Sequence, residues 1–149
     1  MRRFLPLLLV AAACEQPLEI HPGVGLTAAV VVSPQFLSPG DIVTVTVRVT
    51  NLNEGPLELR FPNECVFAYV LLDADEEIAA PTTGCGSSAT NHEFPTGISE
   101  RVFTFAVGDA AHPIGAGTYQ VYGGLSFPMV IVSEPEILQV NVPEFRHAH

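Results

Sequence analysis

The chain lacks tryptophan and lysine altogether and has only three cysteines among its 149 residues. Without lysine, six arginines face 16 acidic side chains, which gives a formal net charge of −10. Such an excess of negative charge repels nucleic acid phosphates, so nucleic acid is not an expected partner. It also opposes electrostatic adhesion to anionic lipid. The length is that of a single domain.

The N-terminus lacks an apolar run long enough to span a membrane. Arg2 and Arg3 precede an apolar stretch over residues 4–10, and the small residues Ala11-Ala12-Ala13 follow it. A spanning helix needs about 20 apolar residues. A positive start, a short apolar core and a small-residue end form the pattern of a secretory signal. We therefore predict that residues 1–13 are a signal peptide.

A cysteine directly follows the small residues. The stretch Ala11-Ala12-Ala13-Cys14 resembles the lipobox of bacterial lipoproteins, although that family usually has Leu, Val or Ile where Ala11 stands. The resemblance implies that Cys14 is acylated and that its partner is the lipid bilayer, with about 0.8 kcal/mol gained per buried methylene. The expected location is the cell envelope, at the periplasmic face or the cell surface. A plain secretory signal with an incidental cysteine is the alternative.

The two other cysteines are expected to form a disulfide. If Cys14 carries lipid, Cys65 and Cys85 are left as a pair, and an exported compartment permits their oxidation. Closing that loop would constrain the unfolded chain by roughly 3 kcal/mol. Removal of the signal leaves four arginines against 16 acidic side chains, a net charge of −12.

The part of the chain after the signal lacks any helical apolar stripe and has strand patterns instead. In residues 42–50 the four valines alternate with threonine and arginine, the pattern of a strand with one buried face. Shorter strands are expected around it, separated by Gly, Pro and Asn turns. We expect strands over residues 26–32, 42–50, 57–61, 65–72, 101–107, 115–125 and 136–142, with a short continuation over 78–81.

These strands predict an all-β fold, an immunoglobulin-like antiparallel β-sandwich of about seven strands. Residues 14–25 are expected to be a tether, 26–142 the sandwich domain and 143–149 a C-terminal tail. Residues 81–97 have no periodic pattern and are expected to be the longest irregular segment.

Several turns and strands together resemble a known family. Ser38-Pro39-Gly40 precedes the alternating strand, Asn51 follows it, an aromatic strand ends at Asp73 and Asp75, and Gly117-Thr118-Tyr119 lies near the end. This series, over residues 35–127, resembles the intracellular proteinase inhibitor (BsuPI-like) family, whose members are immunoglobulin-like β-sandwiches. The chain departs from the family in having no tryptophan, and Glu76 stands where the hairpin has glycine. The resemblance implies the fold, but it assigns inhibition to no named residue here.

The acidic stretch Asp73–Glu77 could be a calcium loop or a hairpin turn. Counted from Asp73 as the first place of a helix-loop-helix calcium loop, Ile78 takes the place of the required Gly, and Gly84 that of the Glu. Adjacent turn carboxylates also do not face each other across a cleft, as glycosidase acids do. The hairpin turn is favoured, and an irregular calcium site stays an alternative.

The cysteines could also take part in a metal or catalytic site. Cys65 and Cys85 with His92 or His112 lack the C-x-x-C spacing of zinc sites, and Cys85, His92 and Met129 lack the grouping of a copper site. Cys85 beside a histidine base matches no catalytic signature. We therefore expect no metal, no cofactor and no enzyme.

The function that the sequence favours is a membrane-tethered envelope lipoprotein carrying a non-catalytic, protein-binding β-sandwich that could resemble a protease inhibitor. Loops on a rigid scaffold, or an exposed strand edge, would bind the protein partner. The alternative is a structural or accessory lipoprotein with no ligand of its own.

Overall fold

The computed structural model describes residues 25–74, 76–79, 85–126 and 131–141. The predicted signal peptide, Cys14, Met129 and the C-terminal tail lie outside the described residues. The described strands are β1 (Leu26–Ser33), β2 (Phe36–Leu37), β3 (Ile42–Asn51), β4 (Leu57–Phe61), β5 (Phe67–Asp73), β6 (Glu76–Ala79), β7 (Thr90–Phe94), β8 (Gly97–Ala106), β9 (Gly117–Leu125) and β10 (Glu136–Val140). In the described part of the chain there is no apolar helix of membrane-spanning length.

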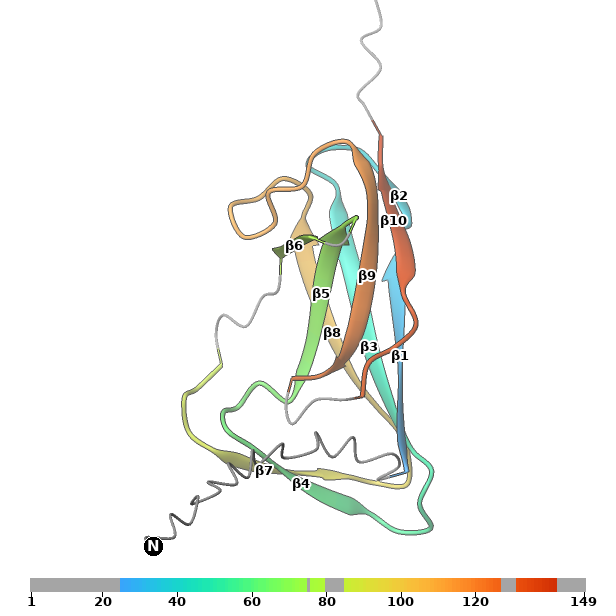
Figure 1. The fold of residues 1–149 in the computed structure, drawn as a ribbon, viewed down its shortest axis with the longest axis vertical. Coiled ribbons are helices and arrows are strands. Elements are labelled where there is room, and N and C mark those ends of the chain that lie inside the picture. Colours follow the sequence, from blue (N-terminus) through green and yellow to red (C-terminus); the bar gives the residue numbers. More distant parts are fainter. Residues whose placement is uncertain (1–24, 75, 80–84, 127–130, 142–149) are drawn as a thin grey trace, which may run out of the picture.

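Two sheets pack face to face, and a third, two-stranded sheet lies across one end of them (Figure 1). The first sheet has the order β1-β3-β8, and the second has the order β2-β10-β9-β5-β6. Strands β4 and β7 form the pair at the end. All pairings are antiparallel except that of β2 with β10. The immunoglobulin-like β-sandwich is therefore confirmed, although with ten described strands rather than about seven.

The core lies between the two large sheets. All four odd-numbered valines of β3 have no solvent exposure, as its alternating pattern predicts. Three of them share an apolar cluster with inward residues of β5, β9 and β10, which include Leu71, Val121 and Leu138, whereas Val49 belongs to a second cluster with Phe61 and Phe94. At 25 cal/mol per Å² of apolar surface, burial of each such side chain contributes about 1.5 to 3 kcal/mol.

The two large sheets approach each other closely at Gly123 of β9. A Cβ built on Gly123 would lie 2.8 Å from Cγ2 of Val47 and 3.1 Å from Cβ of Val30. Those two valines belong to β3 and β1 of the opposite sheet. Only glycine at this position allows the two layers to pack at this distance.

The expectation of an irregular segment over residues 81–97 was wrong in its second half. Residues 90–94 form β7, which pairs along its whole length with β4. Its residues include Asn91 and Glu93, whose β-propensity is low, so pairing and burial decide the conformation. Phe94 and Phe61 are completely buried at 6.4 Å between ring centroids.

The acidic stretch is a hairpin between β5 and β6. Asp73 pairs with Glu76 and Leu72 with Glu77, so the connection is shorter than the whole acidic stretch. Ala74 begins it with φ of +53°, the left-handed conformation that a tight hairpin turn requires. Asp73 and Glu76 therefore extend the two strands.

Candidate binding site at the open side of the sandwich

One side of the sandwich is open, between β5 and β8. Strand β8 is the last strand of its sheet and pairs only with β3 among the described strands. On the facing sheet, β6 covers only the end of β5, from Leu71 to Asp73, and leaves the rest of its edge free of described strands (Figure 1). Two sheet edges with unpaired backbone groups therefore lie on the same side of the molecule.

The hydrogen bonds of Val107, the residue after β8, show which backbone groups of β8 point toward β3 and which point away from it. Val107 donates its N–H to the carbonyl of Asp41 and accepts from the N–H of Gly40, so both of its groups point toward the β3 side. Backbone groups alternate along an antiparallel strand. The N–H and C=O of the even-numbered residues therefore face away from β3. Those of Ile98, Glu100, Val102 and Thr104 face the open edge, whereas those of Ala106 bond to Asp109.

A cavity of about 590 Å³ opens beside this edge. This volume is within the range of about 300 to 1,000 Å³ typical of ligand sites. Strands β5, β7 and β8, the loop before β5 and the loop after β8 all contribute to its walls. The lining residues are Glu64, Cys65, Val66, Phe67, Tyr69, Cys85, His92, Glu100, Arg101, Phe103, Thr104 and His112.

Aromatic rings from both sheets form the apolar part of the cavity. The ring of Phe103 on β8 lies 5.0 Å from that of Tyr69 on β5, tilted by 59°. Phe67, two residues before Tyr69 on β5, lies 5.9 Å from His92 between ring centroids, in a T-shaped arrangement. Phe103 and Phe67 are only partly buried, so each presents part of its ring to the open space.

A chain of hydrogen bonds forms one end of the cavity. Oδ1 of Asp109 lies 2.9 Å from Nδ1 of His112, and Nε2 of His112 lies 2.7 Å from the hydroxyl of Tyr69. The carboxylate can only accept, so Nδ1 carries a proton and, in the neutral ring, Nε2 accepts from Tyr69. The His112 ring also stacks on Phe105 with 3.9 Å between centroids. The arrangement fixes the loop after β8 against β5.

The electrostatics of this chain favour a structural role. Burial, and secondarily the charge of Asp109, raise the pKa of the Tyr69 hydroxyl far above its ordinary value. The hydrogen bond from the His112 side chain lowers the pKa of Asp109, and the backbone N–H groups of His112 and Ala106 act in the same direction. Tyr69 is thus held as a protonated donor, which is the opposite of an activated nucleophile.

The disulfide predicted between Cys65 and Cys85 is confirmed, and it lies at the rim of the cavity. The two Cα atoms are 5.3 Å apart. Next to it, the N–H of Glu64 donates to the carbonyl of Gly86 at 3.0 Å, and the hydroxyl of Ser126 donates to the carbonyl of Cys65. The segment that begins at Cys85 is thereby attached to the start of β5.

This disulfide removes the free thiols that the metal and nucleophile alternatives required. The cavity does bring Cys85, His92 and His112 to one place, as those alternatives supposed. A cysteine in a disulfide, however, offers no thiolate for a metal or a substrate. Within the described ranges there is no group of three metal-ligating side chains. The acidic hairpin does not line the cavity.

Sequence reasoning missed the inward position of Arg101. The strand expected over residues 101–107 shows an imperfect alternation of Val102, Phe103 and Phe105 with Arg101 and Thr104. The register divides these residues differently, because Arg101, Phe103 and Phe105 lie opposite the inward valines of β3. Val102 is 51% exposed on the outer face. The alternation of Arg101 with the two phenylalanines was the available signal.

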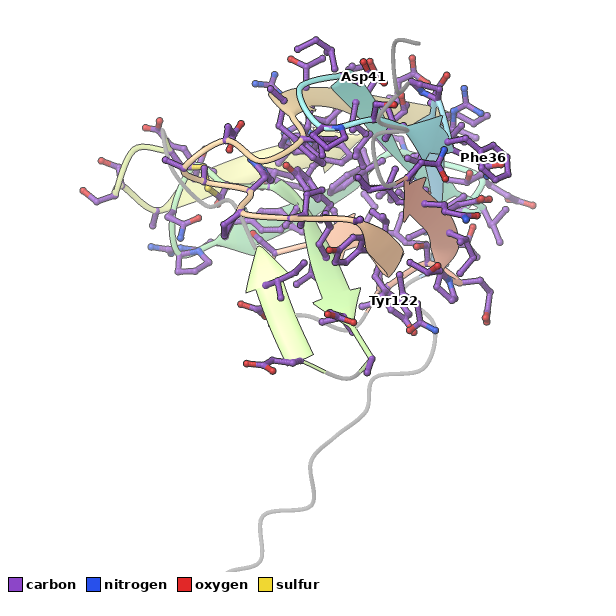
Figure 2. The ribbon with its side chains drawn as sticks, turned by 90° about the horizontal axis from the view of Figure 1, so that it is seen from above. Phe36, Asp41 and Tyr122 are labelled. Atoms are coloured by element: carbon purple, nitrogen blue, oxygen red, sulfur yellow. A yellow bond between two sulfur atoms is a disulfide. The ribbon has the colours of Figure 1, made fainter. Side chains whose placement is uncertain are left out.

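Apolar side chains elsewhere on the surface are not part of this site. Phe36 in β2 is 68% exposed, and Figure 2 shows it at the periphery of the molecule. Tyr122, also labelled there, lies on the outer face of β9, where its hydroxyl is 3.2 Å from Oε1 of Gln120. Neither residue lines the cavity.

No protein-family model and no curated protein sequence matches the chain. Among solved structures, it is similar to the alkylpurine DNA glycosylase AlkC of Pseudomonas fluorescens bound to DNA containing an abasic site analog, with a TM-score of 0.52 and 11% identity over 80% of this chain. It is also similar to the sporulation control protein Spo0M of Bacillus subtilis, with a TM-score of 0.49 and 18% identity over 79% of this chain.

The chain spans 31% of the length of the glycosylase and 50% of that of Spo0M. A third similar structure is the CARDB domain of PF1109 from Pyrococcus furiosus, with a TM-score of 0.45 and 12% identity over 78% of this chain and 94% of that domain. At these identities the likeness concerns the fold alone.

Proposed function

We propose that the chain is a bacterial envelope lipoprotein, held to the bilayer through acylated Cys14, whose β-sandwich binds a protein partner without catalysis. The observation that carries the binding part is the open side between β5 and β8, where an unpaired strand edge borders a cavity. An extended segment of the partner adds to β8 as a further strand and directs alternate side chains into the cavity.

The edge of β8 presents enough backbone hydrogen-bonding groups to hold an added strand. Four residues of this ten-residue strand direct one N–H and one C=O each toward the open side. Each hydrogen bond contributes about 0.5 to 1.5 kcal/mol net. A partner strand that forms several of them, and fills part of the cavity, would reach an affinity in about the micromolar range.

The chemistry of the cavity supports binding over catalysis. Its sulfurs form a disulfide, and its tyrosine is buried and keeps its proton. What remains is an aromatic wall with polar groups around it, which suits recognition of side chains.

A selection experiment tests strand addition. A display library of random peptides of about ten residues is selected on the full-length chain, and the recovered peptides are then measured on two variants. Val102→Pro removes one edge-facing N–H, and it changes a side chain that lies on the outer face, away from the cavity. The control, Val102→Thr, keeps that N–H. We expect Val102→Pro to weaken binding about tenfold and Val102→Thr to leave it unchanged.

Equal binding to both variants, with circular dichroism showing both folded, would exclude strand addition at β8.

Two further tests address the other parts of the proposal. Cys14→Ser should release the protein from membranes, and unchanged fractionation would refute the lipid anchor. For protease inhibition, the chain is titrated into a panel of proteases, and unaltered rates throughout would refute that version.

A further inference from the structure

Arg101 is an exposed cation on the inward face of β8. The other residues on this face are apolar or small. It lies opposite Val47 in the register with β3, and its side chain lines the cavity. Among the described residues no carboxylate lies within ion-pair distance of its guanidinium. The neighbouring Arg48 differs, because its Nε is 3.1 Å from Oε2 of Glu100 on the outer face.

An apolar subsite lies two residues further along the same face. Phe103 is half-buried against Tyr69 and presents the rest of its ring to the cavity. Residues two apart on a strand are separated by about 7 Å and point the same way. An added strand carries its own side chains at the same spacing, so two of them face Arg101 and Phe103 together.

We propose that the partner segment carries one carboxylate side chain that pairs with Arg101, and an apolar side chain two residues away that packs on Phe103 and Tyr69. This inference rests on the proposed strand addition. One guanidinium matches one carboxylate, and two glutamates, Glu64 and Glu100, already line the same cavity. A run of acidic residues would also be repelled by the net charge of −10.

The order of the two side chains reports the direction of the added strand. In an antiparallel strand the residue opposite Phe103 comes first and the carboxylate follows it. In a parallel strand the carboxylate comes first. The geometry therefore limits the recognised motif to one of two orders, with a single intervening residue.

The test uses the peptides whose binding is weakened by Val102→Pro. We expect an Asp or Glu two positions from an apolar residue to be enriched among them, and its change to Asn or Gln to weaken binding about tenfold. On Arg101→Gln the acidic and amide peptides should bind equally, and Arg101→Lys should restore part of the difference. The matched control is Arg60→Gln on β4, which removes one positive charge from an exposed arginine that does not line the cavity, and it should leave the difference unchanged.

The two proposals fail in distinguishable ways. If no peptide discriminates Val102→Pro from Val102→Thr, strand addition fails, and this inference fails with it. If such peptides exist but bind equally well as acid and amide, or lose the same factor on Arg60→Gln as on Arg101→Gln, only the role of Arg101 is overturned.

Discussion

The hydroxyl of Tyr69 lies 2.7 Å from Nε2 of His112, so that β5 of one sheet is joined to the loop after β8 of the other. His112 is itself held by Asp109 at 2.9 Å and is 5% exposed. This contact fixes the end of the cavity beside the open edge.

Tyr69→Phe should therefore destabilise the fold. It leaves the buried Nε2 of His112 without a donor, at a cost of about 1 to 3 kcal/mol. The matched control is Tyr122→Phe, whose hydroxyl is bonded to Gln120 on the outer face and whose loss should cost under about 0.5 kcal/mol. Denaturant unfolding of both variants measures the two costs, and equal values would show that the contact with His112 contributes nothing.

The depressed pKa of Asp109 predicts a loss of stability in acid. Since the folded-state pKa lies below that of the unfolded chain, the contribution is complete above about pH 4 and is lost as the pH falls through the folded value. Asp109→Asn should make stability fall less steeply below about pH 4, and His112→Gln should do the same because it removes the main hydrogen bond. Acid slopes identical to that of the wild type in both variants would contradict this assignment.

Asn51 links the turn after β3 to β7. Its Nδ2 donates to the carbonyls of Gly55 at 3.0 Å and Phe94 at 2.9 Å, and its Oδ1 accepts from the backbone N–H of Asn53 at 3.0 Å. Asn51 is 2% exposed, so Asn51→Ala leaves buried groups unpaired and should cost about 2 to 4 kcal/mol. The control Asn91→Ala, at an exposed position of β7, should cost under about 0.5 kcal/mol. Thermal unfolding compares the stability of the two variants. A loss of stability in Asn51→Ala as small as that in Asn91→Ala would show that the turn forms without the hydrogen bonds of Asn51.

Gly123 tests the close packing of the two sheets. Gly123→Ala places a methyl group 2.8 Å from Cγ2 of Val47, and relief of that overlap should cost about 1 to 3 kcal/mol. Gly55→Ala is the control, because nothing lies within 4 Å of its added Cβ. Denaturant unfolding measures the free energy of unfolding of both variants. An equal loss in Gly123→Ala and Gly55→Ala would disprove the tight contact.

The parts of the fold with a local signal could be predicted from the sequence. The alternation in residues 42–50 predicts β3 and its buried face, and the pairing of Cys65 with Cys85 was predicted on the premise that Cys14 carries lipid. Strand β7 could not be predicted, because pairing with β4 and burial of Phe94 outweigh its weak local propensity.

The candidate site depends on contacts between distant segments, which no local pattern encodes. Tyr69 and His112 are 43 residues apart in the chain, and Arg101 faces the cavity only because of the register between β8 and β3. The likeness to the proteinase inhibitor family also stays a prediction, since no comparison tests it.

Amide hydrogen exchange along β8 tests the central claim most directly. The full-length chain is compared with and without the tightest peptide from the display selection. Strand addition predicts slower exchange, by about tenfold or more, at the edge-facing amides of Glu100, Val102 and Thr104, while Arg101 and Phe103, already bonded to β3, change little. Unchanged exchange at the edge-facing amides in the saturated complex would contradict the account.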